Sequence, residues 1–128
     1  MAKEVNQRIA TPESVTLQMA EMLKEELKGY SGYGNAYLAT IEYVEGPIWV
    51  MDLYNGKYTH HAILEETSAP GSARLLYIYA GELKPHGIID MGQTYQRQIL
   101  CDGVVKLQIG QVFSNEKLEP CIEWKTIA

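Results

Sequence analysis

The sequence predicts an α+β fold: one N-terminal amphipathic helix packed on a strongly curved, mainly antiparallel β-sheet of about six to seven strands, shaped like half a barrel. Apolar residues recur at helical spacing before residue 29 and alternate with polar residues after residue 35. Two turn sequences, Asn55-Gly56 and Asp102-Gly103, separate pairs of alternating segments. At 128 residues the chain is long enough for one core. We therefore expect a single domain over residues 1–128.

The helix is predicted over about residues 12–28, followed by a connector over residues 29–35. Thr11 can accept a hydrogen bond from a free backbone amide, and Pro12 suits the first helical position. The Glu13 carboxylate favours the positive end of the helix dipole. The predicted buried stripe consists of Val15, Met19, Met22, Leu23 and Leu27.

The β-sheet is predicted over residues 36–127, where apolar and polar side chains alternate. The segment Leu75–Ala80 is apolar on both faces, which predicts a central strand that is covered on both sides. One helix covers only one sheet face, so either curvature or a second subunit must cover the other. We therefore also expect a homo-oligomer. The predicted strands are residues 36–44, 47–54, 57–66, 73–80, 93–100, 104–113 and 120–127.

The first hairpin is predicted from Asn55-Gly56, which favours a two-residue type I′ turn. This turn places Asp52 opposite Thr59, so that His61 lies diagonally from Asp52 on a face of mixed polarity. A histidine that is oriented by a carboxylate can act as a general base. A polar pair at the protein surface explains the same pattern without any catalytic role.

For the second hairpin we predict a three-residue loop, Cys101–Gly103, because it keeps one face apolar by pairing Ile99 with Val105 and Arg97 with Leu107. This register leaves the Arg97 guanidinium on an apolar face, where it needs a carboxylate, a tyrosine ring or an anionic ligand. The opposite face would suit assembly because glutamine predominates there. Its predicted residues are Gln96, Gln98, Lys106 and Gln108.

Tyrosine is the dominant aromatic residue, with nine tyrosines against two tryptophans and one phenylalanine. A tyrosine buries its ring while its hydroxyl still needs a partner, which favours half-exposed recognition surfaces. Three tyrosines combine an apolar strand setting with a neighbouring arginine. The predicted ligand-binding residues are therefore Arg97, Tyr95, Tyr77 and Tyr79, with His61 and Asp52 as polar orienting groups.

Three functions fit these patterns. The first is a non-enzymatic binding protein that holds a small anionic or aromatic, nucleotide-like ligand in a pocket lined by tyrosine and arginine. The alternative is a small acidic protein-interaction module, such as a phage-type inhibitor or adaptor. A hydrolase or isomerase that uses the His61–Asp52 pair is the third. We predict no catalytic motif, metal site or cofactor.

Charge and hydropathy narrow the expected partners to a small-molecule ligand or a protein. The formal net charge of −5 and the scattered lysines and arginines argue against direct nucleic-acid binding. The sequence has neither a signal-peptide pattern nor a run of ~18 apolar residues, so we expect a cytoplasmic protein without membrane contact. Cys101 and Cys121 lack the spacing of metal ligands, which predicts free thiols.

Overall fold

The computed structural model describes residues 10–41, 44, 46–66, 73–80, 85–87, 89, 92–101 and 103–128, and only the backbone of residues 85–87 and 101. One α-helix, one 3₁₀ turn at Glu26–Gly29 and a series of strands lie in this part of the chain. The helix and strands are α1 (Pro12–Met22), β1 (Gly32–Tyr33), β2 (Tyr37–Ile41), β3 (Ile48–Asn55), β4 (Tyr58–Glu66), β5 (Ala73–Ala80), β6 (Pro85–Gly87), β7 (Thr94–Cys101), β8 (Val104–Ser114) and β9 (Pro120–Thr126).

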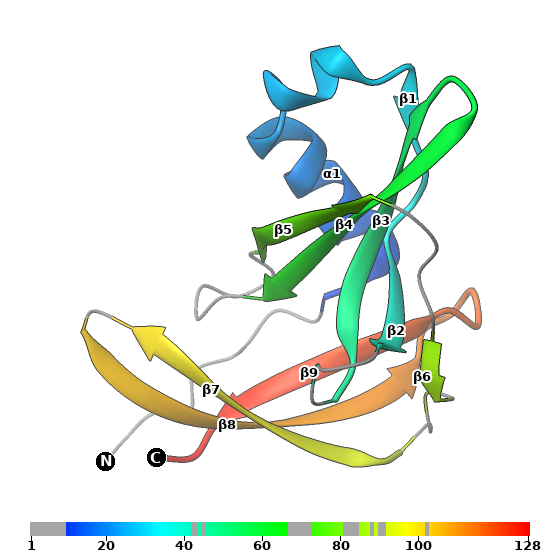
Figure 1. The fold of residues 1–128 in the computed structure, drawn as a ribbon. Coiled ribbons are helices and arrows are strands. Elements are labelled where there is room, and N and C mark those ends of the chain that lie inside the picture. Colours follow the sequence, from blue (N-terminus) through cyan, green and yellow to red (C-terminus); the bar gives the residue numbers. More distant parts are fainter. Residues whose placement is uncertain are drawn as a thin grey trace.

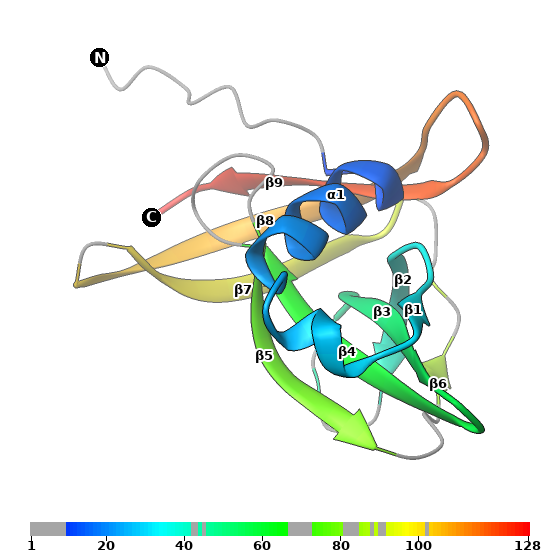
Figure 2. The ribbon, with the colours of Figure 1, turned by 90° about the horizontal axis from the view of Figure 1, so that it is seen from above.

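The strands form two antiparallel sheets where the sequence predicted one (Figure 1). The first sheet is six-stranded, in the order β5-β4-β3-β2-β6, and β1, which lies within the predicted connector, pairs with β3. The second sheet is three-stranded, in the order β7-β8-β9. Its long strands cross one end of the first sheet (Figure 2). The α+β class with antiparallel sheets is confirmed, and the described residues form no closed barrel; the half-barrel curvature stays a prediction.

The helix begins as predicted and ends early. Thr11 Oγ1 accepts a hydrogen bond from the Ser14 amide at 3.1 Å, and Ser14 Oγ accepts one from the Thr11 amide at 2.9 Å. This reciprocal capping box satisfies two free amides at the first turn. The helix ends at Met22 instead of about residue 28, and the chain continues into the 3₁₀ turn. The tighter turn directs Leu27, which is partly buried, against the core.

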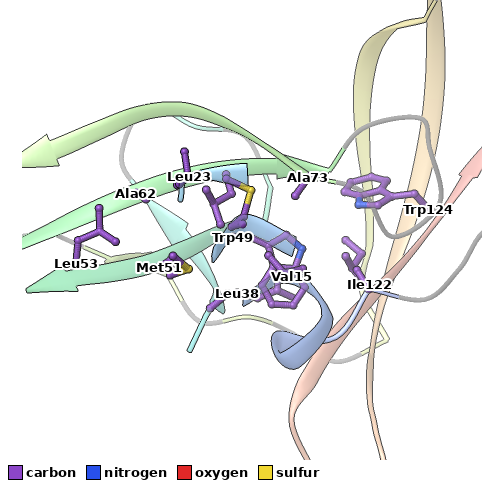
Figure 3. Packing of buried hydrophobic residues seen from close by; sticks show 14 of the residues in the cluster. Val15, Leu23, Leu38, Trp49, Met51, Leu53, Ala62, Ala73, Ile122 and Trp124 are labelled. Atoms are coloured by element: carbon purple, nitrogen blue, oxygen red, sulfur yellow. The ribbon is translucent and has the colours of Figure 1, made fainter. Parts of the chain in front are cut away.

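The main core is formed by α1, one face of the first sheet and one face of the second (Figure 3). Trp49 and Met51 on β3 are almost completely buried in it. Full burial of such large side chains stabilises the fold by about 1.5–3 kcal/mol each. We call the face of the first sheet that carries Trp49 the inner face, and the opposite one the outer face. The core includes Val15, Met19, Leu23, Leu38, Trp49, Met51, Leu53, Ala62, Leu64, Ala73, Val112, Ile122 and Trp124.

The β3–β4 hairpin differs from the predicted register by one position on each strand. Asn55 pairs with Tyr58, and the two-residue loop begins at Gly56, whose φ is +61°. A positive φ at the first loop position is typical of a type II′ turn, and glycine adopts it without strain. Because of this register, Asp52 lies directly opposite His61 instead of diagonally. The shift leaves the membership of the two faces unchanged, since both strands move together.

The predicted three-residue loop of the second hairpin is wrong. Cys101 pairs with Val104, and Arg97 pairs with Gln108. This one-residue difference brings Gln108, rather than Leu107, onto the face that carries Arg97. Gln108 is 1% exposed, and its side-chain oxygen accepts a hydrogen bond from Arg97 Nε at 2.9 Å. The register thus gives the partly buried guanidinium a hydrogen-bond acceptor. The predicted register was chosen from the apolar pattern alone, which does not take this requirement into account.

The prediction of a central position for β5 is also wrong, because β5 is an edge strand of the first sheet. Leu75 and Ile78 pack against the core, whereas Tyr77 and Tyr79 are 46% and 44% exposed. A tyrosine tolerates this position because its hydroxyl can stay in water while part of its ring is buried. Counting tyrosine as an apolar residue produced the wrong assignment.

Candidate binding site

Polar and aromatic side chains gather on the outer face of the first sheet. Asp52, His61 and Tyr79 are direct cross-strand neighbours on β3, β4 and β5. In the adjacent row, Tyr37 lies on β2 and Tyr77 on β5, with two buried apolar residues between them. We call this set the tyrosine face, and it consists of Tyr37, Asp52, Tyr54, His61, Tyr77 and Tyr79.

Asp52 is the hydrogen-bonding centre of the tyrosine face. Its Oδ1 accepts hydrogen bonds from His61 Nδ1 at 2.8 Å and from the Tyr37 hydroxyl at 3.1 Å. The side chains of His61 and Asp52 are 12% and 28% exposed, so water screens this pair only in part. Because the Asp52 carboxylate is an acceptor, a neutral His61 carries its hydrogen on Nδ1, and Nε2 is its acceptor nitrogen.

Tyr37 acts as a hydrogen-bond donor at neutral pH. Burial, followed by the charge of Asp52 and the hydrogen bond to it, raises the pKa of Tyr37 to about 12. The hydroxyl therefore keeps its proton throughout the physiological range. Its contribution is to hold the Asp52 carboxylate in one orientation, which in turn orients His61.

The tyrosines around this centre are partly open to solvent. Tyr54, Tyr77 and Tyr79 are 40%, 46% and 44% exposed. Tyr54 lies over Gly34, since a Cβ atom added to Gly34 would stand 2.9 Å from the Tyr54 hydroxyl. The absence of a side chain at Gly34 thus allows the Tyr54 ring to lie along the sheet beside Asp52.

The structure places Arg97 away from the tyrosine face. Its guanidinium carbon lies 3.8 Å from the centre of the Trp124 ring, and its Nε donates to Gln108. Trp124 belongs to the core, on the inner side of the first sheet. Arg97 therefore stacks on a tryptophan instead of a tyrosine. One buried guanidinium nitrogen has no hydrogen-bond partner among the described residues. Tyr95 lies on the same strand and packs against the same core.

Glu66 is the carboxyl group with the largest electrostatic effect on the pKa of Arg97. It is 5% exposed, and its Oε1 accepts a hydrogen bond from Trp49 Nε1 at 2.8 Å. Burial raises the pKa of Glu66 to about 7, while the Trp49 hydrogen bond and the Arg97 charge oppose this rise. Burial likewise lowers the pKa of Arg97 to about 10, against the effect of Glu66 and Glu65. These groups form an interior cluster in which both charged groups are strongly desolvated.

The six predicted site residues therefore separate into two groups. Tyr77, Tyr79, His61 and Asp52 lie together on the tyrosine face, whereas Arg97 and Tyr95 lie on the second sheet, facing the core. Sequence reasoning omitted Tyr37 and Tyr54 from the site. Strand alternation alone places Tyr54 beside Asp52, but the position of Tyr37 depends on the pairing of β2 with β3, which no local signal specifies.

Among the described residues, no group of three or more histidine, cysteine, aspartate or glutamate side chains could hold a metal ion. None of the described helices is long and apolar enough to cross a membrane. Cys121 is a free, buried thiol whose pKa is raised by burial. Comparison with family models, curated proteins and solved structures found no match for the chain.

Proposed function

We propose that this chain is a non-enzymatic binding protein, and that the tyrosine face holds a small, uncharged planar heteroaromatic ligand. The observation that carries the proposal is the placement of two half-exposed tyrosines, Tyr77 and Tyr79, beside the hydrogen-bonded His61–Asp52 pair. Together they offer ring surfaces for stacking and oriented polar groups for hydrogen bonding, which is the usual composition of a small-molecule site.

The spacing of the two tyrosines suits a planar ligand. Tyr77 and Tyr79 are two residues apart on one face of β5, so their backbones are separated by ~6.6 Å. A flat ring between two other rings needs ~7 Å, or twice a contact distance of ~3.5 Å. His61, directly across from Tyr79, can then bond to the edge of the bound ring through its imidazole.

The charges on this face favour an uncharged ligand over the anionic one that the sequence suggested. Arg97, the expected anion-binding residue, lies on the second sheet against Trp124. On the outer face, Arg74 is ion-paired with Glu65, at 2.9 Å between Nη2 and Oε2. Asp52 and the net charge of −5 would repel a phosphate group. Nucleosides and free heterocycles therefore fit this site better than nucleotides do.

A binding panel of nucleobases, nucleosides, their 5′-monophosphates and indoles tests the proposal, with saturation-transfer NMR as the readout. We expect uncharged members to bind and monophosphates to bind no more tightly. Tyr79→Ala should weaken binding about fivefold or more, because one ring–base stack contributes about 1–3 kcal/mol. Tyr58→Ala is the matched control, since Tyr58 is 71% exposed at the hairpin end and outside the tyrosine face. Equal affinity in the two variants would count against the proposal.

A protein-interaction module remains the alternative, because the same half-exposed tyrosines suit a protein interface. The two proposals differ in what Tyr79→Ala changes. A protein partner that copurifies with the chain and is lost in Tyr79→Ala, together with a panel in which no heterocycle binds, would favour the module. In that case the tyrosine face would still be the binding surface, but it would bind a protein instead of a heterocycle.

The hydrogen bonds of Asp52 favour acid–base chemistry as a second candidate function. A His61 held by Asp52 through Nδ1, with Nε2 as its acceptor nitrogen, is the arrangement of a general base in hydrolases and isomerases. The test is hydrolysis of a panel of activated esters by the chain and by His61→Gln. A rate above background that disappears in His61→Gln supports this candidate, and a rate equal in both variants removes it.

A further inference from the structure

The second sheet has an edge strand, β7, with little protection against pairing. All eight of its residues pair with β8 in one continuous register, from Thr94 opposite Gln111 to Cys101 opposite Val104. The strand contains no proline and no carboxylate, and its one charged residue, Arg97, faces the core. On the opposite face, its side chains are exposed and uncharged: Thr94, Gln96, Gln98 and Leu100. Natural edge strands are usually blocked by charges, prolines or bulges.

Two other strand edges differ from β7 in this respect. At β9, Ala10 forms a bridge with Ile122, and the outward side chains include Glu123. At β5, the Ala73 amide donates to the Gln18 side chain at 2.8 Å. Both edges therefore carry features that limit pairing with another strand, whereas none of the described contacts covers the free edge of β7.

We propose that two copies of this chain pair through β7, antiparallel and about a two-fold axis, so that the second sheets of both copies join into one six-stranded sheet. A strand at an edge can pair with its own copy in this way, because a two-fold axis perpendicular to the sheet makes the two strands antiparallel. The uncharged outward side chains allow this contact between copies that each carry a net charge of −5.

Symmetry limits the possible registers of the pairing. A two-fold axis perpendicular to the sheet keeps each side chain on the same face of the sheet. Directly opposed residues of the two strands must also share a face, so the axis has to lie where one residue is opposite its own copy. An axis at Arg97 would set two guanidinium groups opposite each other, which is unfavourable. An axis at Gln98 retains pairing over residues 95–101 and sets Gln98 against Gln98 of the partner subunit. It also covers part of Leu100, which is 70% exposed, with Gln96 of the partner subunit.

The first test is the mass of the protein in solution, measured by light scattering on a sizing column. We expect a dimer for the natural chain. Gln98→Lys should halve the mass, because it places two ammonium groups opposite each other on the axis. Gln111→Lys is the matched control: the same change at an exposed position of the same sheet, on the central strand β8. A monomeric natural chain, or a dimer that Gln98→Lys leaves intact, overturns the proposal.

A disulfide trap tests the register independently and does not depend on how Gln98→Lys folds. Directly opposed residues of antiparallel strands have Cα atoms ~4.5–5.5 Å apart, which a disulfide can bridge. In a Cys101→Ser background, Gln98→Cys should therefore form covalent dimers on mild oxidation, and Gln96→Cys should form far fewer. Equal cross-linking at both positions, or none at Gln98→Cys, contradicts the register. The proposal is independent of the tyrosine face, which lies on the first sheet.

Discussion

The natural chain should lose stability as the pH rises because Glu66 ionises. Replacing Glu66 with glutamine should remove this dependence on pH. The Glu66 carboxyl is buried, and burial raises its pKa from 4.5 to about 7. In the unfolded chain the same carboxyl ionises near its ordinary pKa. The folded state therefore binds more protons than the unfolded state between these two pKa values, and stability falls with rising pH across that window.

The size of the effect follows from the two pKa values. The stabilising contribution of protonated Glu66 is complete below pH 4.5 and is lost as the pH rises through about 7. The difference between these two pKa values corresponds to about 3 kcal/mol in total, most of which is lost between pH 5 and pH 8. In Glu66→Gln the side-chain oxygen can still accept the Trp49 hydrogen bond, but no proton is exchanged.

The assay is urea denaturation of the natural chain and of Glu66→Gln at several pH values between 5 and 8. The difference in unfolding free energy between the two proteins should change by about 2–3 kcal/mol over this range, in favour of the variant at high pH. Other titrating groups are common to both proteins and cancel in the difference. Glu65→Gln, which removes an outer-face partner of Arg74, serves as the control. Parallel stability curves for the natural chain and Glu66→Gln would refute the argument.

Two further substitutions test the packing. Gly110→Ala should destabilise the fold by about 1–3 kcal/mol, because its Cβ would stand 2.5 Å from the Trp124 ring. Gly29→Ala is the control, since nothing lies within 4 Å of its Cβ. Equal melting temperatures of the two variants would contradict the prediction for Gly110. Thr16→Val should cost about 1–3 kcal/mol, because Thr16 Oγ1 accepts the buried Ala36 amide at 2.6 Å. A change below about 0.5 kcal/mol in urea denaturation would show that this hydrogen bond is dispensable.

Strand positions could be predicted from the sequence because alternation is a local property. The predicted range 73–80 agrees with β5, and 120–127 differs from β9 by one residue. Strand order was not predictable in the same way. The division into two sheets depends on packing between segments far apart in the chain, such as Val112 and Ile122, which belong to the same core as Trp49. No pattern within one segment specifies those contacts.

The two hairpins illustrate why only part of the candidate site could be predicted. At the first hairpin, the register error preserved the faces, so Asp52 and His61 still fell on the same face as predicted. At the second, the apolar pattern favoured Leu107 opposite Arg97, whereas the structure places Gln108 there. The requirements of one buried guanidinium and of the Trp124 ring decided this register, and both arise from tertiary contacts.

The central claim is that the tyrosine face is the ligand-binding surface. Chemical-shift mapping tests it most directly, by titrating the ¹⁵N-labelled chain with the tightest-binding heterocycle of the panel. We predict that the largest amide shifts occur at His61, Tyr77 and Tyr79, with small shifts at Arg97. Shifts concentrated at Arg97 and its neighbours on the second sheet would contradict the claim and would place the site at the interior Arg97–Glu66 cluster.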